Sequence, residues 1–402
     1  MIELNLEEEI CKFGATIKVM GIGGAGGNAV NSMITSNHFS DIEFIVANTD
    51  LQALKQSPAP CKIQLGAKIT KGLGAGANPD LGRKAAEEDL ESVIQNLNNT
   101  DILFLTAGLG GGTGTGALPV IVRAAKDLGI LTIAVVTKPF LFEGRRRLKF
   151  ATEAIETLRG SVDTLIVVPN QKLLEVSDTN ISMLDAFAKS DDILNQAIKG
   201  ISDIIAKPGH INVDFADVRT IMKDTGMAIM GIGRASGPNR AKDAALAAIN
   251  SQLLENTNIR GAKGVLVNIT GDSALGLQEI CAATSFVSEM VSEDANIIFG
   301  TVIDESMGDE VAVTVIATGF ENAQPATVAS SPAITISQEI KTAPVAETAV
   351  AEKSVKIATM IHEDDLLECA ADVKEGKIDL DDFDAPTFLR KKMESEARSH
   401  QN

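Results

Sequence analysis

The run Gly110-Gly111-Gly112-Thr113-Gly114-Thr115-Gly116 constrains the fold of this chain more than any other feature. It follows a short apolar segment, residues 102–105, and leads into an apolar, helix-like stretch. Glycine lets a ligand approach the main chain closely, and backbone N–H groups ahead of a helix form an anion-binding concavity. The sequence therefore predicts a phosphate-binding strand–loop–helix unit, in which Gly112 faces a phosphate.

A second glycine loop, residues 21–28, follows an earlier apolar segment and precedes another helix-like stretch. Gly21, Gly23 and Gly26 match the dinucleotide fingerprint, so a nicotinamide-dependent oxidoreductase is one alternative. That reading leaves residues 110–116 unexplained. In an open α/β sheet, ligands lie beyond the carboxyl ends of the strands, and two loops converging there favour a polyphosphate ligand. No Gly-Lys-Ser/Thr follows either loop, which excludes the common P-loop.

Apolar strand-like segments alternate with helix-like ones over the first 180 residues. The predicted strands are 16–20, 42–47, 102–106, 131–136 and 164–168, and the helices between them include 82–97 and 117–128. Unbroken hydrophobicity is typical of strands buried on both faces, so we expect a mostly parallel sheet covered by helices. A long helix is predicted from 182 to 206, with Met183, Phe187, Leu194, Ile198, Ile201 and Ile205 on its apolar face.

A second, smaller α/β region is predicted after the break at Lys207-Pro208-Gly209. Its expected strands are 227–232, 264–269, 297–302 and 310–317, and its expected helices are 240–254 and 275–291. Beyond Phe320 the sequence becomes rich in Ala, Thr, Ser and Pro, which predicts a disordered linker over 321–378. Phe383, Phe388 and Leu389 then stand in a polar tail, and indicate a partner-binding peptide over 379–393.

Composition limits the class of protein. The net charge is −18, and there is neither Trp nor Tyr. A nucleic-acid partner is therefore not expected, because binding a phosphate backbone needs clustered cations. No apolar run reaches the roughly 20 residues that cross a bilayer, and the acidic N-terminus does not resemble a secretory signal. The four cysteines match neither a zinc nor a redox pattern. We expect a cytoplasmic protein without direct membrane insertion.

Together these motifs resemble the FtsZ family, the bacterial tubulin-like cell-division GTPases. The resemblance covers about residues 14–320 and the tail, and rests on residues 110–116, 21–28, 48–50, 72–79, 142–145, 212–217 and 388–390. It implies a tubulin-like α/β fold with a Rossmann-type nucleotide-binding domain. The implied boundaries are an N-terminal extension 1–13, a GTP-binding domain 14–181, a central helix 182–207 and a C-terminal α/β domain 208–320, before the linker 321–378 and the peptide 379–393.

The resemblance also implies the residues of the site. Those implied to bind GTP or GDP are Gly23, Gly24, Ala25, Gly26, Gly27, Asn28, Gly111, Gly112, Thr113, Gly114, Glu143, Arg147, Asn170, Phe187 and Asp191. Ala25 stands where the family often has glycine. Those implied to be catalytic are Asn212, Asp214 and Asp217: the two aspartates polarise the attacking water and help to organise Mg²⁺, and Asn212 orients them. No protein metal site is expected. A simpler alternative for Asp217 is that it only caps a helix.

Distance along the predicted helix separates the two sets. From Asp191 to Pro208 a helix advances about 25 Å at 1.5 Å per residue. The acidic loop therefore cannot easily reach the nucleotide of its own chain, and a second copy stacked head to tail can supply it. The expected function is a GTPase activated by polymerisation in the mid-cell division ring. Residues 379–392 would bind membrane-attached adaptors such as FtsA or ZipA. A filament-forming scaffold that does not hydrolyse GTP is a further alternative.

Overall fold

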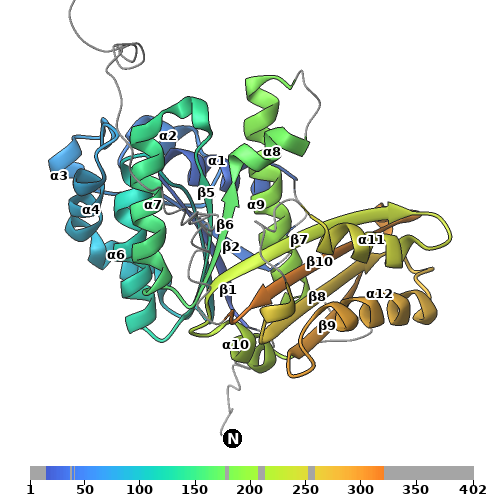
Figure 1. Ribbon diagram of the computed structural model, residues 1–402. Helices are drawn as coiled ribbons and strands as arrows, with labels where there is room; N and C mark the ends of the chain where they lie inside the picture. Colours follow the sequence, from blue (N-terminus) through green and yellow to red (C-terminus); the bar gives the residue numbers. More distant parts are fainter. Residues whose placement is uncertain are drawn as a thin grey trace, which may run out of the picture. The chain divides into compact units, whose positions relative to one another are not determined.

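The computed structural model describes residues 15–36, 39, 41–176, 181–206, 213–251 and 259–320. The predictions for 1–13, 321–378 and 379–393 lie outside these residues. The described strands form one sheet in the order β3-β2-β1-β4-β5-β6-β7-β10-β8-β9. Figure 1 shows this sheet running through the molecule, with helices on both of its sides.

The first six strands are all parallel, as the sequence predicts. They are β1 (Ile17–Ile22), β2 (Ile42–Asn48), β3 (Cys61–Gln64), β4 (Ile102–Gly108), β5 (Leu131–Lys138) and β6 (Thr164–Pro169). β1 lies between β2 and β4, so the loops that follow β1 and β4 leave the same edge side by side. This edge holds both glycine loops.

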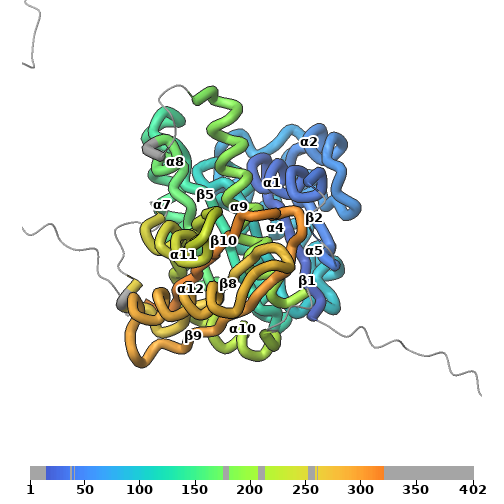
Figure 2. The backbone as a smooth tube through the Cα atoms, turned by 90° about the vertical axis from the view of Figure 1, so that its right-hand side faces the viewer, coloured from blue at the N-terminus to red at the C-terminus, as the bar shows by residue number. Residues whose placement is uncertain are grey.

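The long strand β7 (Gly226–Ser236) joins the parallel half of the sheet to a mixed half. Its first residues pair in parallel with β6, and the rest pairs antiparallel with β10 (Glu310–Thr318). β10 is antiparallel to β8 (Gly264–Gly271), and β8 is parallel to β9 (Asn296–Ile303). The helices α11 (Arg240–Ile249) and α12 (Leu277–Met290) pack on this half, as Figure 2 shows.

Helices cover both faces of the parallel half. One face packs against α1 (Gly23–Ser36), α9 (Met183–Ala206) and α10 (Phe215–Met222). The other face packs against α4 (Pro79–Glu88), α5 (Leu90–Leu97), α6 (Thr113–Asp127) and α7 (Arg145–Arg159). The shorter helices are α2 (Leu51–Gln56), α3 (Ala67–Thr70) and α8 (Asn170–Val176). Among the described residues, no helix is long and apolar enough to span a membrane.

The central helix α9 differs from its prediction at its start. Leu194, Ile198 and Ile201 are buried in the core, but Met183 is 64% exposed and Phe187 is 38% exposed. Helical spacing predicts a core position for all five, but the first two turns run beyond the packed face. This exposed start lies next to the glycine-loop edge, because Phe187 lines the cavity described below.

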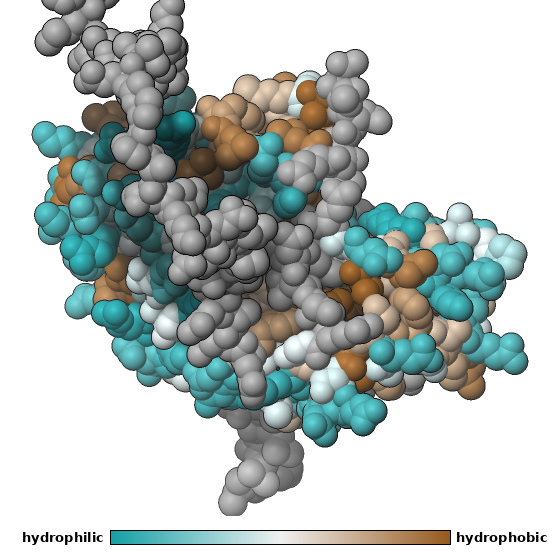
Figure 3. All heavy atoms as spheres, viewed as in Figure 1, coloured by the Kyte–Doolittle hydropathy of each residue, from teal (hydrophilic) through white to brown (hydrophobic). Residues whose placement is uncertain are grey.

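Two other predictions need correction. The single helix expected over 82–97 is two helices, α4 and α5, because the chain bends at Asp89. The Asp89 carboxylate accepts the backbone N–H of Gly66 at 2.6 Å, which explains the bend. The sequence also misses β3, a short edge strand preceded by Pro58 and Pro60. In Figure 3, hydrophilic side chains dominate the left and lower parts of the face shown, and hydrophobic ones form smaller patches.

Candidate functional site

A cavity of about 260 Å³ lies beyond the carboxyl ends of β1, β4 and β5. It collects eleven of the residues implied to bind nucleotide: Gly24, Ala25, Gly111, Gly112, Thr113, Gly114, Glu143, Arg147, Asn170, Phe187 and Asp191. Further lining residues include Gly108, Leu109, Thr137, Pro139, Ser190 and Leu194. The two glycine loops therefore converge on one site, as expected.

Glycines in this cavity have two different roles. A Cβ atom added to Gly24 or Gly111 would meet no protein atom within 4 Å, so these two main-chain positions border open space. Gly112 differs, because its Cβ would lie 2.8 Å from Ala75 Cβ and 2.9 Å from Asn78 N. A side chain at Gly112 would therefore displace residues 75–78. Gly112 also lines the cavity, and that it faces a phosphate stays a prediction.

The hydroxyl groups of the glycine loop brace it from within. Thr115 Oγ1 accepts the backbone N–H of Gly110 at 2.9 Å. Thr113 Oγ1, at the start of α6, lies 2.7 Å from Thr49 Oγ1, which lies just before α2. This buried contact joins two segments that are far apart in the sequence. These contacts hold the loop in place, and α6 begins at the cavity directly after Gly112.

Four of the predicted residues lie outside the cavity lining: Gly23, Gly26, Gly27 and Asn28. The helix α1 begins at Gly23, so these residues form its first turns rather than a loop. A Cβ on Gly26 would lie 2.2 Å from the carbonyl oxygen of Thr106 in β4. Gly26 therefore allows α1 to pack closely on the sheet, which places Gly24 and Ala25 at the cavity.

Aromatic rings and polar side chains form the far end of the cavity. The Phe187 ring packs edge-on against Phe140, with ring centroids 5.3 Å apart. Ser190 Oγ donates to Asn170 Oδ1 at 2.8 Å, which fixes the buried Asn170 amide. Desolvation, with a smaller contribution from Asp192, raises the pKa of Asp191 from 3.8 to about 6. Burial removes water from the charged form of this carboxyl group, so hydrogen bonds donated by a ligand would stabilise its ionised form.

Arg147 supplies positive charge at the cavity and is oriented by Glu143. The guanidinium Nη1 donates to Glu143 Oε2, and Glu143 Oε1 accepts the N–H of Phe140 at 3.0 Å. The pair belongs to the turn before α7 and the first turn of α7. Arg147 is thereby held at the cavity wall, where it can contact a phosphate.

The acidic residues expected to be catalytic lie elsewhere. Asp214 and Asp217 are exposed at the start of α10, and Asn212 lies outside the described residues. Arg219 of α10 donates to the carbonyl of Gly129, just before β5, and Thr164 at the start of β6 donates to the Met222 carbonyl. α10 therefore lies at the amino ends of the strands, opposite the cavity (Figure 1).

Among the described residues, no group of three or more His, Cys, Asp or Glu side chains could hold a metal ion.

Asp214 is the N-cap residue of α10, but its side chain makes no capping hydrogen bond. Asp217, for which helix capping is the simpler alternative, does not occupy the N-cap position but lies in the first turn of α10.

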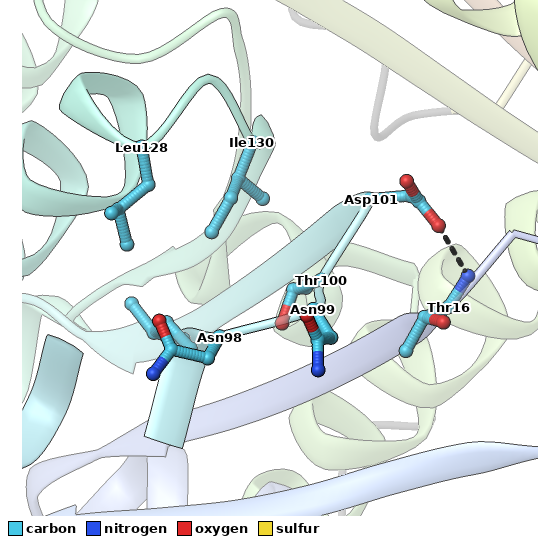
Figure 4. Close-up of a pocket in the computed structure, with 8 residues that line it drawn as sticks. Thr16, Asn98, Asn99, Thr100, Asp101, Leu128 and Ile130 are labelled. Carbon is cyan, nitrogen blue, oxygen red and sulfur yellow. Dashed lines mark hydrogen bonds between the residues drawn. The ribbon is translucent and has the colours of Figure 1, made fainter. Parts of the chain in front are cut away.

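A second cavity, of about 370 Å³, is larger but chemically unsuited to phosphates. It lies at the amino edge of the sheet and is lined by Thr16, Leu97, Asn98, Asn99, Thr100, Asp101, Leu128 and Ile130. Figure 4 shows Asp101 accepting the backbone N–H of Thr16, a bond of 2.8 Å. Its only charged lining residue is the Asp101 carboxylate, which would repel a polyphosphate. We assign the nucleotide to the smaller, glycine-lined cavity.

Helices α1 and α6 both begin at the cavity, whose lining also holds Arg147, Phe187 and Asp191. This fold and site define the class of tubulin-like nucleotide-binding proteins. Residues 16–178 match the family model described as the Tubulin/FtsZ family GTPase domain, and residues 226–321 match the FtsZ family C-terminal domain. The chain belongs to the FtsZ family, and its N-terminal half is a GTPase domain that binds GTP.

Curated relatives and solved structures agree with this assignment. The cell division protein FtsZ of Pseudomonas putida is 50% identical over 391 residues, which cover 93% of this chain and 96% of the relative. The protein of the same name from Pseudomonas aeruginosa is 56% identical, over 76% of this chain and 77% of the relative. An empty FtsZ dimer from M. jannaschii is 42% identical with a TM-score of 0.73, over 76% of this chain and 88% of that one.

Proposed function

We propose that this protein is a cell-division GTPase that polymerises head to tail and hydrolyses GTP at sites shared between neighbouring subunits. One observation carries the proposal: the nucleotide cavity and the acidic start of α10 lie at opposite edges of the sheet. From Asp191 in the cavity to Ala206 at its end, α9 rises about 22 Å at 1.5 Å per residue. A second copy is therefore needed to bring the two together. The relatives are named for cell division, and one neighbour is described as a dimer.

In this proposal each side chain has a defined task. The N–H groups at the starts of α1 and α6 hold the phosphates, and Arg147 adds charge. Phe187 stacks on the guanine, while Asp191 accepts hydrogen bonds from its N1–H and N2 amino group. In the next subunit, Asp214 and Asp217 orient the attacking water, and Asn212 assists them. Positioning and charge stabilisation supply most of the catalysis in phosphoryl transfer.

We propose that Mg²⁺ enters with the nucleotide, since this ion keeps several waters and usually binds one or two carboxylates plus substrate phosphates. The exposed Asp214 and Asp217 carboxylates offer oxygen ligands of this kind. Bound there, the ion would neutralise charge on the phosphates. In this proposal the nucleotide brings the Mg²⁺ ion, and Asp214 and Asp217 would orient the ion rather than hold it on their own.

Binding at the glycine cavity is tested by Gly111→Asp. Neither Gly111 nor Gly160 has a positive φ, and a Cβ at either meets nothing within 4 Å, so both positions accept a side chain. We expect Gly111→Asp to lower the affinity for GTP at least tenfold, because its carboxylate faces the phosphates. The matched control, Gly160→Asp at the end of α7, should bind normally. Equal GTP affinity of the two variants in equilibrium titrations would contradict the assignment.

The shared site is tested by Asp214→Ala. This variant should bind GTP normally, because its own cavity is intact, and should hydrolyse it poorly. Mixed with the parent chain, it should lower turnover per parent chain, since it supplies defective neighbours. The parent's specific activity should itself rise with protein concentration. A specific activity that stays flat over the assembly range would rule out hydrolysis between subunits.

The tail is proposed to bind adaptors of the FtsA or ZipA kind through residues 379–392, and so to gather filaments at the mid-cell division ring. These residues lie outside the described part of the chain, and the proposal rests on their sequence. Ending the chain at Phe320 should leave GTP binding and turnover unchanged but abolish co-sedimentation with adaptor-coated vesicles. Equal recruitment of both chains would place the partner site in residues 1–320.

A further inference from the structure

One buried carboxylate ties α10 to the GTPase domain. Asp163, just before β6, is only 3% exposed. Its Oδ2 accepts the backbone N–H of Thr132 at 2.9 Å and the Thr132 hydroxyl at 2.7 Å. Its backbone carbonyl accepts the N–H groups of Thr225 and Gly226, both at 2.9 Å, in the turn after α10. Asp163 therefore joins the starts of β5 and β6 to the end of α10.

Lys126 completes this anchor from the last turn of α6. Its Nζ lies 2.7 Å from Asp224 Oδ1 and 3.5 Å from Asp163 Oδ1. Asp224 belongs to the same turn after α10 and has a φ of +54°, so the turn is tightly shaped. The hydrogen bond between them raises the pKa of Lys126 and lowers that of Asp224, so both stay charged at neutral pH.

The Lys126–Asp224 bridge holds the C-terminal end of the short helix α10. α10 has eight residues, and its hydrogen bonds to the GTPase domain come from its second half: Arg219 donates to the Gly129 carbonyl at 3.2 Å, and the Met222 carbonyl accepts from Thr164. In its first turn the Asp214 and Asp217 side chains are exposed, while Phe215 packs against the core. Eight residues span about 12 Å, so a tilt of about 5° at the anchor moves the acidic end by about 1 Å.

We propose that Lys126 is a positioning residue, which through Asp224 holds α10 at the angle that brings Asp214 and Asp217 to the nucleotide of the neighbouring subunit. This inference rests on the proposed shared site. Because α6 begins at the nucleotide cavity and ends at Lys126, one rigid helix connects the nucleotide that a subunit binds to the acidic residues that it offers its neighbour. A 1 Å displacement of a catalytic group can cost about a hundredfold in rate.

The first experiment compares Lys126→Met with Lys126→Arg and with Lys149→Met. Lys149 is a matched control, an exposed lysine on α7 that pairs only weakly with Glu153 at 3.8 Å. We expect Lys126→Met to bind GTP with the parent affinity and to lose at least tenfold in turnover per assembled chain. Lys126→Arg should recover most of the turnover, and Lys149→Met should match the parent. Asp224→Asn breaks the same bridge from the other side and should reproduce the loss if Lys126→Met folds poorly.

The deciding experiment mixes two defective chains in equal amounts. At a GTP concentration too low to fill its weakened cavity, Gly111→Asp should still offer a normal α10. It should therefore restore turnover to Lys126→Met, which binds GTP but offers a displaced α10. Asp214→Ala, which also lacks a functional acidic end, should not restore it. A general folding defect, or a role for Lys126 in its own cavity, would leave the first mixture inactive and would overturn the proposal.

A reference mixture distinguishes the positioning role of Lys126 from the proposed shared site on which it rests. Asp214→Ala and Gly111→Asp together should regain turnover if sites are shared between subunits. If this reference mixture stays inactive, the shared site itself is wrong, and the positioning role of Lys126 is rejected with it. If only the Lys126→Met mixture stays inactive, the shared site stands and Lys126 has no role in positioning α10.

Discussion

The pKa of Asp191 allows the proposed guanine contact to be tested by pH. In the ligand-free protein, desolvation and then Asp192 raise this pKa from 3.8 to about 6. Two hydrogen bonds from a guanine need the ionised carboxylate, so GTP binds best when Asp191 is already charged. Affinity should therefore be almost fully present above about pH 7, about half as strong near pH 6, and should approach a tenfold fall per unit below that. The perturbation is Asp191→Asn, which removes the titrating group but keeps its size.

The expected magnitudes follow from this pKa. With a value of about 6, about 97% of the Asp191 side chains are ionised at pH 7.5 and about 9% at pH 5. GTP affinity should thus fall about tenfold between these values in the parent. At neutral pH, Asp191→Asn should bind more weakly by about 1.5–3 kcal/mol, the range for hydrogen bonds to a charged group. Equilibrium titration with a labelled GTP, from pH 5 to 8, measures both effects.

Two comparisons isolate Asp191 from the titrating phosphates. In Asp191→Asn, GTP affinity still changes with pH because the GTP phosphates titrate. Any steeper pH dependence of GTP affinity in the parent is therefore due to Asp191. Asp192→Asn is the matched control: it should keep the steep dependence, with its midpoint shifted to slightly lower pH because a like charge is removed. The same pH dependence in the parent and in Asp191→Asn would refute the reasoning. Ligand-free Asp191→Asn should also be more stable at neutral pH, by at most about 3 kcal/mol, with the difference vanishing below pH 4.

Two further predictions concern stability. Glu279→Gln should lower the free energy of unfolding by about 1.5–3 kcal/mol at pH 7, because the buried Arg240 loses its closest charged partner, at 2.9 Å. The bond from Arg240 holds the pKa of Glu279 below 4.5, so urea titrations should show this difference shrinking as pH falls below that value. Gly26→Ala should cost about 1–3 kcal/mol by pushing α1 away from Thr106. Gly24→Ala in the same helix should melt as the parent does, and a Gly26→Ala melt equal to it would contradict the tight contact.

The sequence predicts the sheet well because its strands carry a simple signal. The nine strands that it predicts are all present. Those of the parallel half are apolar runs that are almost wholly buried, whereas β7 and β9 also hold exposed residues and are recognised by their apolar content alone. The missed strand β3 is short and lies at the edge, where only Ile63 is deeply buried, so hydrophobicity cannot mark it. The split at Asp89 is invisible to periodicity, because it depends on a hydrogen bond to Gly66, 23 residues away in the chain.

The candidate site is only partly readable from the sequence. Glycine loops mark its position, but they do not show which glycines border open space: Gly24 and Gly111 do, whereas Cβ atoms on Gly26 and Gly112 would meet neighbouring residues. Ser190 was missed, although its spacing from Phe187 and Leu194 on one face of α9 could have indicated it. The Thr49–Thr113 contact and the Lys126 bridge join segments 64 and 98 residues apart. Such contacts depend on the finished fold and leave no local pattern.

The two edges of the sheet explain why the proposed assembly is open rather than closed. The cavity edge offers backbone N–H groups, the amino ends of α1 and α6, and Arg147. The opposite edge offers the carboxylates of Asp214 and Asp217. Neither surface is complementary to itself, because a two-fold pairing would place acid against acid or one nucleotide against another. Head-to-tail stacking joins unlike edges and leaves a cavity edge free at one end of the filament and an acidic edge free at the other. Growth can therefore continue, and each added subunit completes one catalytic site.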